Sequence, residues 1–183
     1  MVDRSTSEHG FSLTELMMVV ALAGTLMAIS VPLIANVTDG AKLNTAAREV
    51  ERELQTARLK AVTVNRNLRV RTNCPATGFF RTVEVLGDAG TDNDSNRCLE
   101  SAYPFPAPDA DLMTRPNFDG PVHPLLNDVT VTSANLEFRP DGTAYTVVSG
   151  NPQAIESTVT ITVTRNGKSK TVTVNAAGKV QLQ

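Results

Sequence analysis

A single carboxylate opens the most apolar stretch of the chain. Glu15 directly precedes residues 16–35, a run of 20 residues without a charged side chain. Burying a carboxylate at the edge of such a run costs several kcal/mol unless a partner neutralises it. This placement therefore predicts a charge pair between the Glu15 carboxylate and a cationic group.

Enzymatic chemistry is not indicated elsewhere in the sequence. The two histidines are His9 and His123, and His123 has no cysteine or carboxylate at the close spacing of a metal site or a catalytic triad. Gly87, Gly90 and Gly142 are typical of turns, and no glycine-rich phosphate loop follows a strand pattern. We therefore expect that the protein is not an enzyme.

One acidic segment offers oxygens that suit Ca²⁺. Asp88, Asp92 and Asp94 lie within residues 87–96, where almost every position is Gly, Asn, Asp or Ser. Their spacing lacks the alternate-residue loop that ends in a bidentate glutamate. A solvated turn is the favoured interpretation, so we predict no cofactor and no metal.

One basic cluster offers contacts to phosphate groups. Arg165, Lys168 and Lys170 surround an expected hairpin turn, and Lys179 is a candidate neighbour. Clustered cations attract phosphate backbones, which makes DNA binding a weaker alternative. A net charge of −2 indicates no obligatory nucleic-acid partner, and a solvated basic turn is favoured.

A long helix must position Glu15. The uncharged run spans about 30 Å as a helix, which is the thickness of a bilayer's hydrocarbon core. After residue 36 the apolar positions narrow to one stripe with alternating steps of four and three. A nearly continuous helix over residues 11–65 is predicted, and its packing stripe consists of Leu43, Ala47, Val50, Leu54, Ala57, Ala61 and Val64.

The residues around Glu15 form a specific motif. Phe11 follows Gly10 and lies four positions before Glu15, and the sequence GFSLTELMMVVALAGTLMAISVP resembles the N-terminal signature of type IV pilins and type II secretion pseudopilins. The resemblance implies that a prepilin peptidase removes residues 1–10 after Gly10 and methylates the new amino group of Phe11. It also implies that Glu15 meets the Phe11 ammonium of a neighbouring subunit.

This resemblance sets the expected location and partners. A subunit of this kind is held in the inner membrane by one helix, places its head in the periplasm, and contacts other pilins or pseudopilins and a secretion or pilus assembly platform. A plain signal peptide, an ordinary single-pass anchor and a membrane-anchored binding domain that never polymerises are the alternatives. The balanced charge of Asp3, Arg4 and Glu8 departs from the usually basic pilin leader.

Short strands are predicted after the helix. Leu68, Val70, Val83 and Val85 alternate with charged residues, which predicts strands with one solvated face, and the charged positions are Arg69, Arg71, Arg81 and Glu84. Cys74 and Cys98 flank a loop in the exported part of the chain, so we expect one disulfide between them. Residues 101–124 are rich in proline and predict a surface excursion, pinned by Tyr103, Phe105 and Phe118 and able to contact another subunit.

The last third carries the clearest strand signals. Asn166-Gly167 separates two alternating runs, which is the strongest short hairpin signal, and Pro140-Asp141-Gly142 predicts a turn. The strands are expected at residues 129–132, 136–138, 144–148, 159–165, 168–174 and 179–182. The segment FRPDGT at 138–143 and the later Gly178-Lys179-Val180 resemble the heads of type II secretion protein H and similar minor pilins.

The expected fold class is α+β and pilin-like. A long N-terminal helix, half of it transmembrane, packs on an antiparallel β-sheet or sandwich. The predicted organisation is a leader at residues 1–10, a transmembrane and polymerisation helix at 11–35, an amphipathic helix half at 36–66, and a periplasmic head with a disulfide loop at 67–183. The predicted function is a structural minor pseudopilin or minor pilin subunit that supports protein secretion or pilus assembly.

Overall fold

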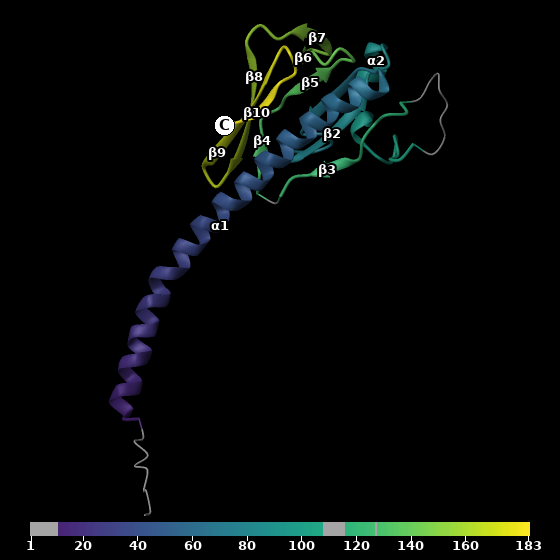
Figure 1. The fold of residues 1–183 in the computed structure, drawn as a ribbon. Coiled ribbons are helices and arrows are strands. Elements are labelled where there is room, and N and C mark those ends of the chain that lie inside the picture. Colours follow the sequence, from purple (N-terminus) through teal and green to yellow (C-terminus); the bar gives the residue numbers. More distant parts are fainter. Residues whose placement is uncertain (1–10, 108–115, 127) are drawn as a thin grey trace, which may run out of the picture. The chain divides into compact units, whose positions relative to one another are not determined.

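The computed structural model describes residues 11–107, 116–126 and 128–183, without the side chains of residues 31–36. The chain divides into two units, one that ends at Asp39 and one that comprises Gly40–Gln183 (the head). The first unit is helical, and the head combines helix and sheet (Figure 1). The expected α+β class is confirmed.

Helix α1 comprises Leu13–Val64 and runs through both units without a break in its secondary structure. This agrees with the predicted helix over residues 11–65. In the head, the apolar stripe of α1 faces the core, because Leu43, Ala47, Val50, Leu54, Ala57 and Ala61 are all buried and only Val64 is partly exposed. The alanines keep this face of α1 narrow, so the strands can approach the helix closely.

The larger sheet of the head is antiparallel and has the strand order β3-β2-β1-β5-β6-β7. Leu68 in β1 pairs with Phe138 in β5, and Val70 pairs with Leu136, so these apolar side chains share the face turned to the core. The strands are β1 (Leu68–Thr72), β2 (Phe79–Glu84), β3 (Val122–Pro124), β5 (Asn135–Phe138), β6 (Ala144–Val148) and β7 (Asn151–Ala154).

The smaller sheet has the strand order β10-β9-β8-β4 and is also antiparallel. Its members are β4 (Thr130–Val131), β8 (Thr158–Arg165), β9 (Lys168–Asn175) and β10 (Val180–Leu182). Asn166 and Gly167 join β8 to β9 with φ angles of 47° and 74°. Two successive positive φ values define a type I′ turn, which confirms the predicted hairpin.

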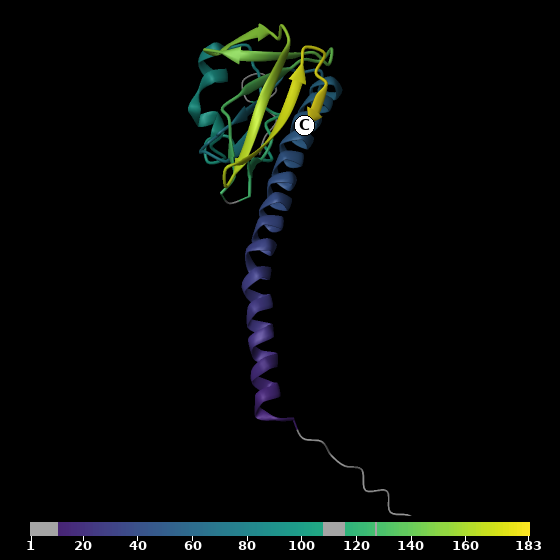
Figure 2. The ribbon, with the colours of Figure 1, turned by 90° about the vertical axis from the view of Figure 1, so that its left-hand side faces the viewer.

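One core joins the two sheets and the head half of α1. Ile161, Val163, Val172 and Val174 of the smaller sheet are fully buried with the stripe of α1 and the apolar face of the larger sheet. Figure 2 shows the yellow strand β10 beside this part of α1. The predicted arrangement of a helix packed on antiparallel sheets is therefore confirmed.

The prediction of a solvated face on β1 and β2 is wrong. Arg69, Arg81 and Glu84 are exposed by 3%, 0% and 4%, respectively. The segment between β2 and β3 folds back over the face that holds Arg69 and Arg81, and it forms α2 (Ala89–Asn93) and a short 3₁₀ helix, Ser95–Cys98. The register also pairs Glu84 with Leu68 and Val83 with Arg69, so Glu84 lies on the core side of β2 and Val83 on the side of the arginines. Alternation in the sequence therefore assigned β2 to the wrong faces relative to β1, and it did not reveal that later residues cover the arginines.

Candidate functional site

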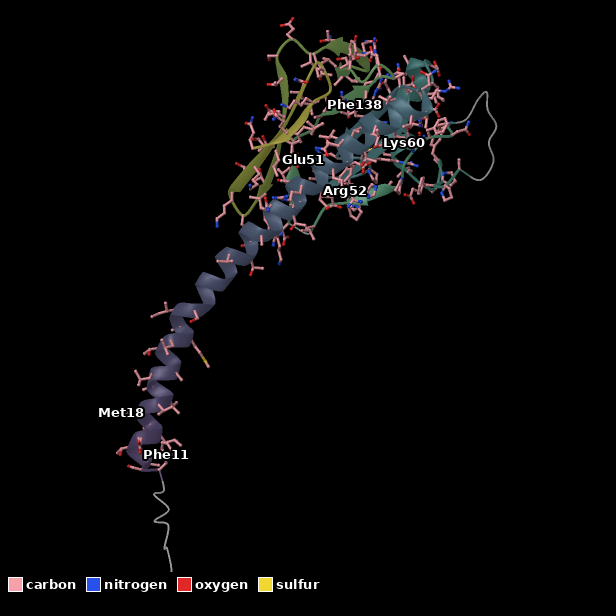
Figure 3. The ribbon with its side chains drawn as sticks, in the orientation of Figure 1. Phe11, Met18, Glu51, Arg52, Lys60 and Phe138 are labelled. Atoms are coloured by element: carbon pink, nitrogen blue, oxygen red, sulfur yellow. A yellow bond between two sulfur atoms is a disulfide. The ribbon has the colours of Figure 1, made fainter. Side chains whose placement is uncertain are left out.

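The apolar surface of α1 in the first unit is the largest functional candidate in the described part of the chain. The stretch Leu13–Ser30 has a mean hydropathy of 1.8 and is long and apolar enough to cross a membrane. None of this stretch is buried within the protein. Phe11 and Met18, which Figure 3 labels, are 77% and 72% exposed. A surface of this composition is stable only against lipid or other apolar helices.

The hydroxyl groups in this stretch bond back to the helix itself. Thr25 donates its hydroxyl hydrogen to the carbonyl of Leu22 at 2.8 Å, and Ser30 donates to the carbonyl of Leu26 at 2.8 Å. Both groups therefore satisfy their donors without water or a partner chain. This arrangement suits an environment without water, where an unpaired hydroxyl would be costly.

Glu15 differs from these hydroxyl groups. It lies in the first turn of α1, and its backbone N–H donates to the carbonyl of Ser12 at 3.1 Å. Its carboxylate is exposed and forms no hydrogen bond or ion pair with any residue that the structure describes. The N-terminus of a helix stabilises a negative charge by up to about 1 kcal/mol, which is less than the cost of burying it. The geometry thus leaves Glu15 ready to pair with an external cation.

Gly10 lies outside the described residues, and so does His9. The structure therefore does not describe the predicted cleavage site. Phe11 is described and exposed, immediately before α1. The roles of Gly10, Phe11 and Glu15 in processing and assembly accordingly remain predictions.

The head contains the predicted disulfide between Cys74 and Cys98. The bond connects the turn after β1 to the 3₁₀ helix, and both cysteines are buried. It closes a loop with a sequence separation of 24 residues. Closing such a loop restricts the unfolded chain and fixes the segment that covers the charged face of β1 and β2.

Two buried arginines hold that segment in place. Arg81 donates to the carbonyls of Gly120, Arg97 and Tyr103 at 2.9, 2.8 and 2.6 Å. Burial lowers the pKa of Arg81 from its ordinary value, and the charge of Asp119 opposes this change. The guanidinium of Arg81 thereby supplies hydrogen-bond donors to three carbonyls that have no backbone N–H partner among the described residues.

Arg97 makes the second set of contacts. It is fully buried and forms an ion pair with Asp119, with 2.7 Å between Nη2 and Oδ1. The same Nη2 donates to the carbonyl of Glu84 at 2.7 Å, and Tyr103 lies with its ring centre 5.1 Å from the guanidinium carbon. The contact confirms an anchoring role for Tyr103, whereas Phe105 is 46% exposed and does not anchor the excursion.

The head face of α1 makes polar contacts as well. Lys60 donates to the carbonyl of Phe118 at 2.8 Å, and burial lowers the pKa of Lys60 from its ordinary value, although nearby carboxylates raise it. Arg58 donates to the carbonyls of Gly142 and Ala177, both at 3.0 Å. α1 thus fixes both the excursion and the turn of the FRPDGT segment.

The three aspartates of the expected solvated turn have protein partners. Asp88 caps α2 by accepting from the Thr91 N–H and hydroxyl, and Asp94 caps the 3₁₀ helix by accepting from the Asn96 N–H. Asp92 is only 4% exposed and accepts from the backbone N–H groups of Leu86 and Gly87. The solvated-turn interpretation is therefore wrong for Asp92, whereas Asp88 is exposed as expected and Asp94 is partly exposed. Among the described residues, no group of three or more His, Cys, Asp or Glu side chains could hold a metal ion.

The four predicted cations do not form one patch. Arg165 is 7% exposed and lies 3.7 Å from a carboxylate oxygen of Asp128. Lys168 pairs with Arg165 at the hairpin turn, and Lys170 lies two residues further along β9. Lys179 bonds through its backbone to Asn175, at the other end of β9, about 23 Å from Lys168 by strand rise. The expected proximity of Lys179 is wrong.

His123 lies beside the head half of α1. Its ring stacks on Phe80 with 5.3 Å between ring centres, and its Nε2 is 3.9 Å from a carboxylate oxygen of Glu53. Glu53 also accepts a hydrogen bond from the Thr82 hydroxyl at 2.9 Å. These contacts join β2 and β3 to α1 and indicate a packing role.

An exposed apolar helix that precedes a disulfide-bonded head of antiparallel sheets defines a membrane-anchored subunit of the pilin class. Comparison of the sequence with known families agrees. Residues 46–178 match the family described as type II transport protein GspH, and residues 5–31 match the prokaryotic N-terminal methylation motif. The chain belongs to the GspH family of pseudopilins, whose members are structural subunits that associate with other pilins.

Solved structures of two minor subunits are similar to this chain. The type IV minor pilin FimU of Pseudomonas aeruginosa shares 19% sequence identity, over 80% of this chain and 92% of FimU, with a TM-score of 0.49. The minor pseudopilin EpsH from the type 2 secretion system of Vibrio cholerae shares 12% identity, over 78% of this chain and 96% of EpsH, with a TM-score of 0.45. No curated protein sequence matches the chain significantly.

Proposed function

We propose that this pseudopilin-family chain is cleaved after Gly10, methylated on Phe11 and assembled as a minor subunit of a type II secretion pseudopilus or of a type IV pilus tip. The observation that carries this proposal is the exposed apolar surface of α1 with Glu15 as its one carboxylate. The match to the N-terminal methylation motif supports the processing step. Residues 11–35 are the polymerisation helix, residues 36–66 are its amphipathic half, and residues 67–183 carry the strands of the periplasmic part.

A charge pair explains how subunits find their register. Cleavage after Gly10 creates an ammonium group on Phe11, four residues before Glu15. In a bundle of apolar helices, the Phe11 ammonium of one subunit can meet the Glu15 carboxylate of a neighbouring subunit. Each charge is costly alone in a low-dielectric bundle and attracts the other strongly. A subunit that is out of register leaves both charges unpaired.

The head supports a periplasmic location. Disulfides form and persist in oxidising compartments, and the head holds Cys74–Cys98. With the head in the periplasm, the apolar helix is anchored in the inner membrane and residues 1–10 face the prepilin peptidase on the cytoplasmic side. The partners are then other pilins or pseudopilins and the assembly platform.

Two measurements test this proposal. Mass spectrometry of the protein from cells with an active prepilin peptidase should show a chain that begins at methylated Phe11. Glu15→Ala should lower incorporation into sheared filaments by at least about tenfold. A tenfold change in an equilibrium constant corresponds to about 1.4 kcal/mol, and a charge pair in a low-dielectric environment contributes more than this. Glu51→Ala, in the head half of α1, is the control and should incorporate normally.

Two results would contradict the proposal. A chain that still begins at Met1 would show that processing does not occur and would favour a membrane-anchored binding domain that never polymerises. Normal incorporation of Glu15→Ala would exclude the charge pair. The two systems are separated by deleting the gene and comparing secreted proteins with surface pili, since a pseudopilin affects secretion and a minor pilin affects piliation.

A further inference from the structure

A polar cleft lies on the larger sheet, on the face away from the core. Its volume is about 300 Å³, which is at the lower end for small-ligand sites. One wall is the start of α2 and the other is the turn between β6 and β7, which lie at the same end of the head (Figure 1). The residues that line it include Arg69, Asp92, Glu137, Arg139, Gly150 and Asn151.

The floor of this cleft holds two arginines that share one carboxylate. Arg69 of β1 and Glu137 of β5 are partners in the sheet register, with 2.9 Å between Arg69 Nη2 and Glu137 Oε2. Arg139 follows two residues after Glu137, on the same face, with its Nε 3.9 Å from Glu137 Oε1. Asp92 is turned toward Arg97 and the backbone of Leu86. Glu137 is therefore the lining carboxylate that lies beside both arginines of the floor.

Arg139 is held in place without hydrogen bonds. Its guanidinium carbon lies 3.6 Å from the centre of the Tyr145 ring, which fixes the plane of the group. The side chain is 34% exposed, and it makes no hydrogen bond with any residue that the structure describes. Its Nε is buried without an acceptor, and so is the Nε of Arg69. Since each guanidinium has five N–H donors, the floor has more donors than acceptors.

We propose that this cleft binds a carboxylate group through Arg139, with Arg69 and Glu137 as positioning residues. A planar carboxylate accepts two parallel N–H donors from a guanidinium, whose stacking on Tyr145 already restricts its rotation. A phosphate dianion would suffer more repulsion from Glu137 and Asp92 than a singly charged carboxylate.

The carboxylate has two sources with the same chemistry. One is a small free organic acid, and the other is an Asp or Glu side chain of another polypeptide. The cleft volume accommodates either of them. The inference does not rest on cleavage or assembly of the chain, because all of its residues belong to the head.

The test uses the full chain in a non-ionic detergent. Side-chain Nε–H signals of ¹⁵N-labelled arginine are followed by NMR while sodium chloride is replaced by sodium acetate, by succinate or by N-acetyl-glutamate amide at constant ionic strength. The Arg139 signal should move in a saturable way. The third probe carries a peptide-like side-chain carboxylate, so tighter binding of it than of succinate indicates a protein ligand, and the reverse indicates a free acid.

Variants separate this site from general charge effects. In the variants at position 139, binding is followed through the Nε–H signal of Arg69, which lines the same cleft. Arg139→Gln should weaken binding at least about tenfold, and Arg139→Lys, which keeps the charge but loses the planar fork, should weaken it less. Arg52→Gln changes an exposed arginine outside the cleft and should bind normally. Unchanged melting temperatures show that the variants fold. A response that does not saturate, that chloride reproduces, or that persists in Arg139→Gln overturns the proposal.

Discussion

The first unit exposes its apolar side chains, whereas the head buries charged ones. In the first unit Leu16, Leu22 and Leu26 are exposed by 56%, 64% and 66%. In the head Arg81 and Arg97 are exposed by 0%. A soluble protein does neither without compensation, because exposed apolar area and unpaired buried charge both cost free energy.

The difference lies in where the compensation is found. The head supplies it internally, since its described buried arginines all contact carboxylates or carbonyls within the same unit. The first unit contains no such partner in the described residues for its apolar surface or for Glu15. We infer that the head is stabilised by its own contacts, whereas the first unit depends on a membrane or on other subunits.

The largest expected effect comes from breaking the compensation in the head. Arg97→Met removes the partner of buried Asp119 and should destabilise the head by about 3–5 kcal/mol, because an uncompensated charge remains. Chemical denaturation of the full chain in detergent measures this change. Arg52→Met, at an exposed arginine, is the control and should change the free energy of unfolding by less than about 0.5 kcal/mol. Equal effects of the two variants would contradict the comparison.

The disulfide gives the next largest effect. Replacing both Cys74 and Cys98 with serine opens a loop with a separation of 24 residues and should cost about 3 kcal/mol through loop-closure entropy. The same denaturation measurement detects it, and reduction of the unchanged protein should lower stability similarly. If insertion of the chain into detergent micelles also changed, the two units would not be energetically independent.

The elements that the sequence predicted are those with local signals. The stripe from Leu43 to Ala61 specified the packed helix, and Asn166-Gly167 specified the hairpin, because helical periodicity and turn chemistry depend on a few adjacent residues. β7 (Asn151–Ala154) was not predicted, since its sequence NPQA has low strand propensity and its pairing with β6 determines its structure. β3, which ends at Pro124, was missed for the same reason.

The buried charges were beyond local reasoning. Arg81 appears in an alternating run that is typical of a half-solvated strand, yet its partners are carbonyls 16 to 39 residues away in sequence. The burial of Arg81 depends on the path of the irregular segment between β2 and β3, and an irregular segment has no periodic sequence signal. A weak signal was present in Cys98, whose disulfide with Cys74 necessarily brings the adjacent Arg97 close to β1 and β2. Glu15, in contrast, was identified from the sequence because the apolar residues that surround it are adjacent to it in the chain.

The smallest expected effect concerns an exposed carboxylate of the head. It tests whether burial of a charged group, rather than its position in the head, determines how much that group contributes to stability. Hydrogen bonds from the Thr143 hydroxyl and backbone N–H hold the pKa of Asp141 below its ordinary value. Because the pKa is lower in the folded state, this carboxylate stabilises the fold above its unfolded pKa of about 3.9, and the contribution is lost as pH falls through the folded pKa.

Thr143→Val should raise the pKa of Asp141 in a ¹³C carboxylate titration. The pKa of Asp88, which Thr91 lowers in the same way, is the internal control and should stay unchanged. Stability at neutral pH should hardly change, since solvent screens the exposed group; a loss as large as that of Arg97→Met would show that location in the head, and not burial, sets the effect.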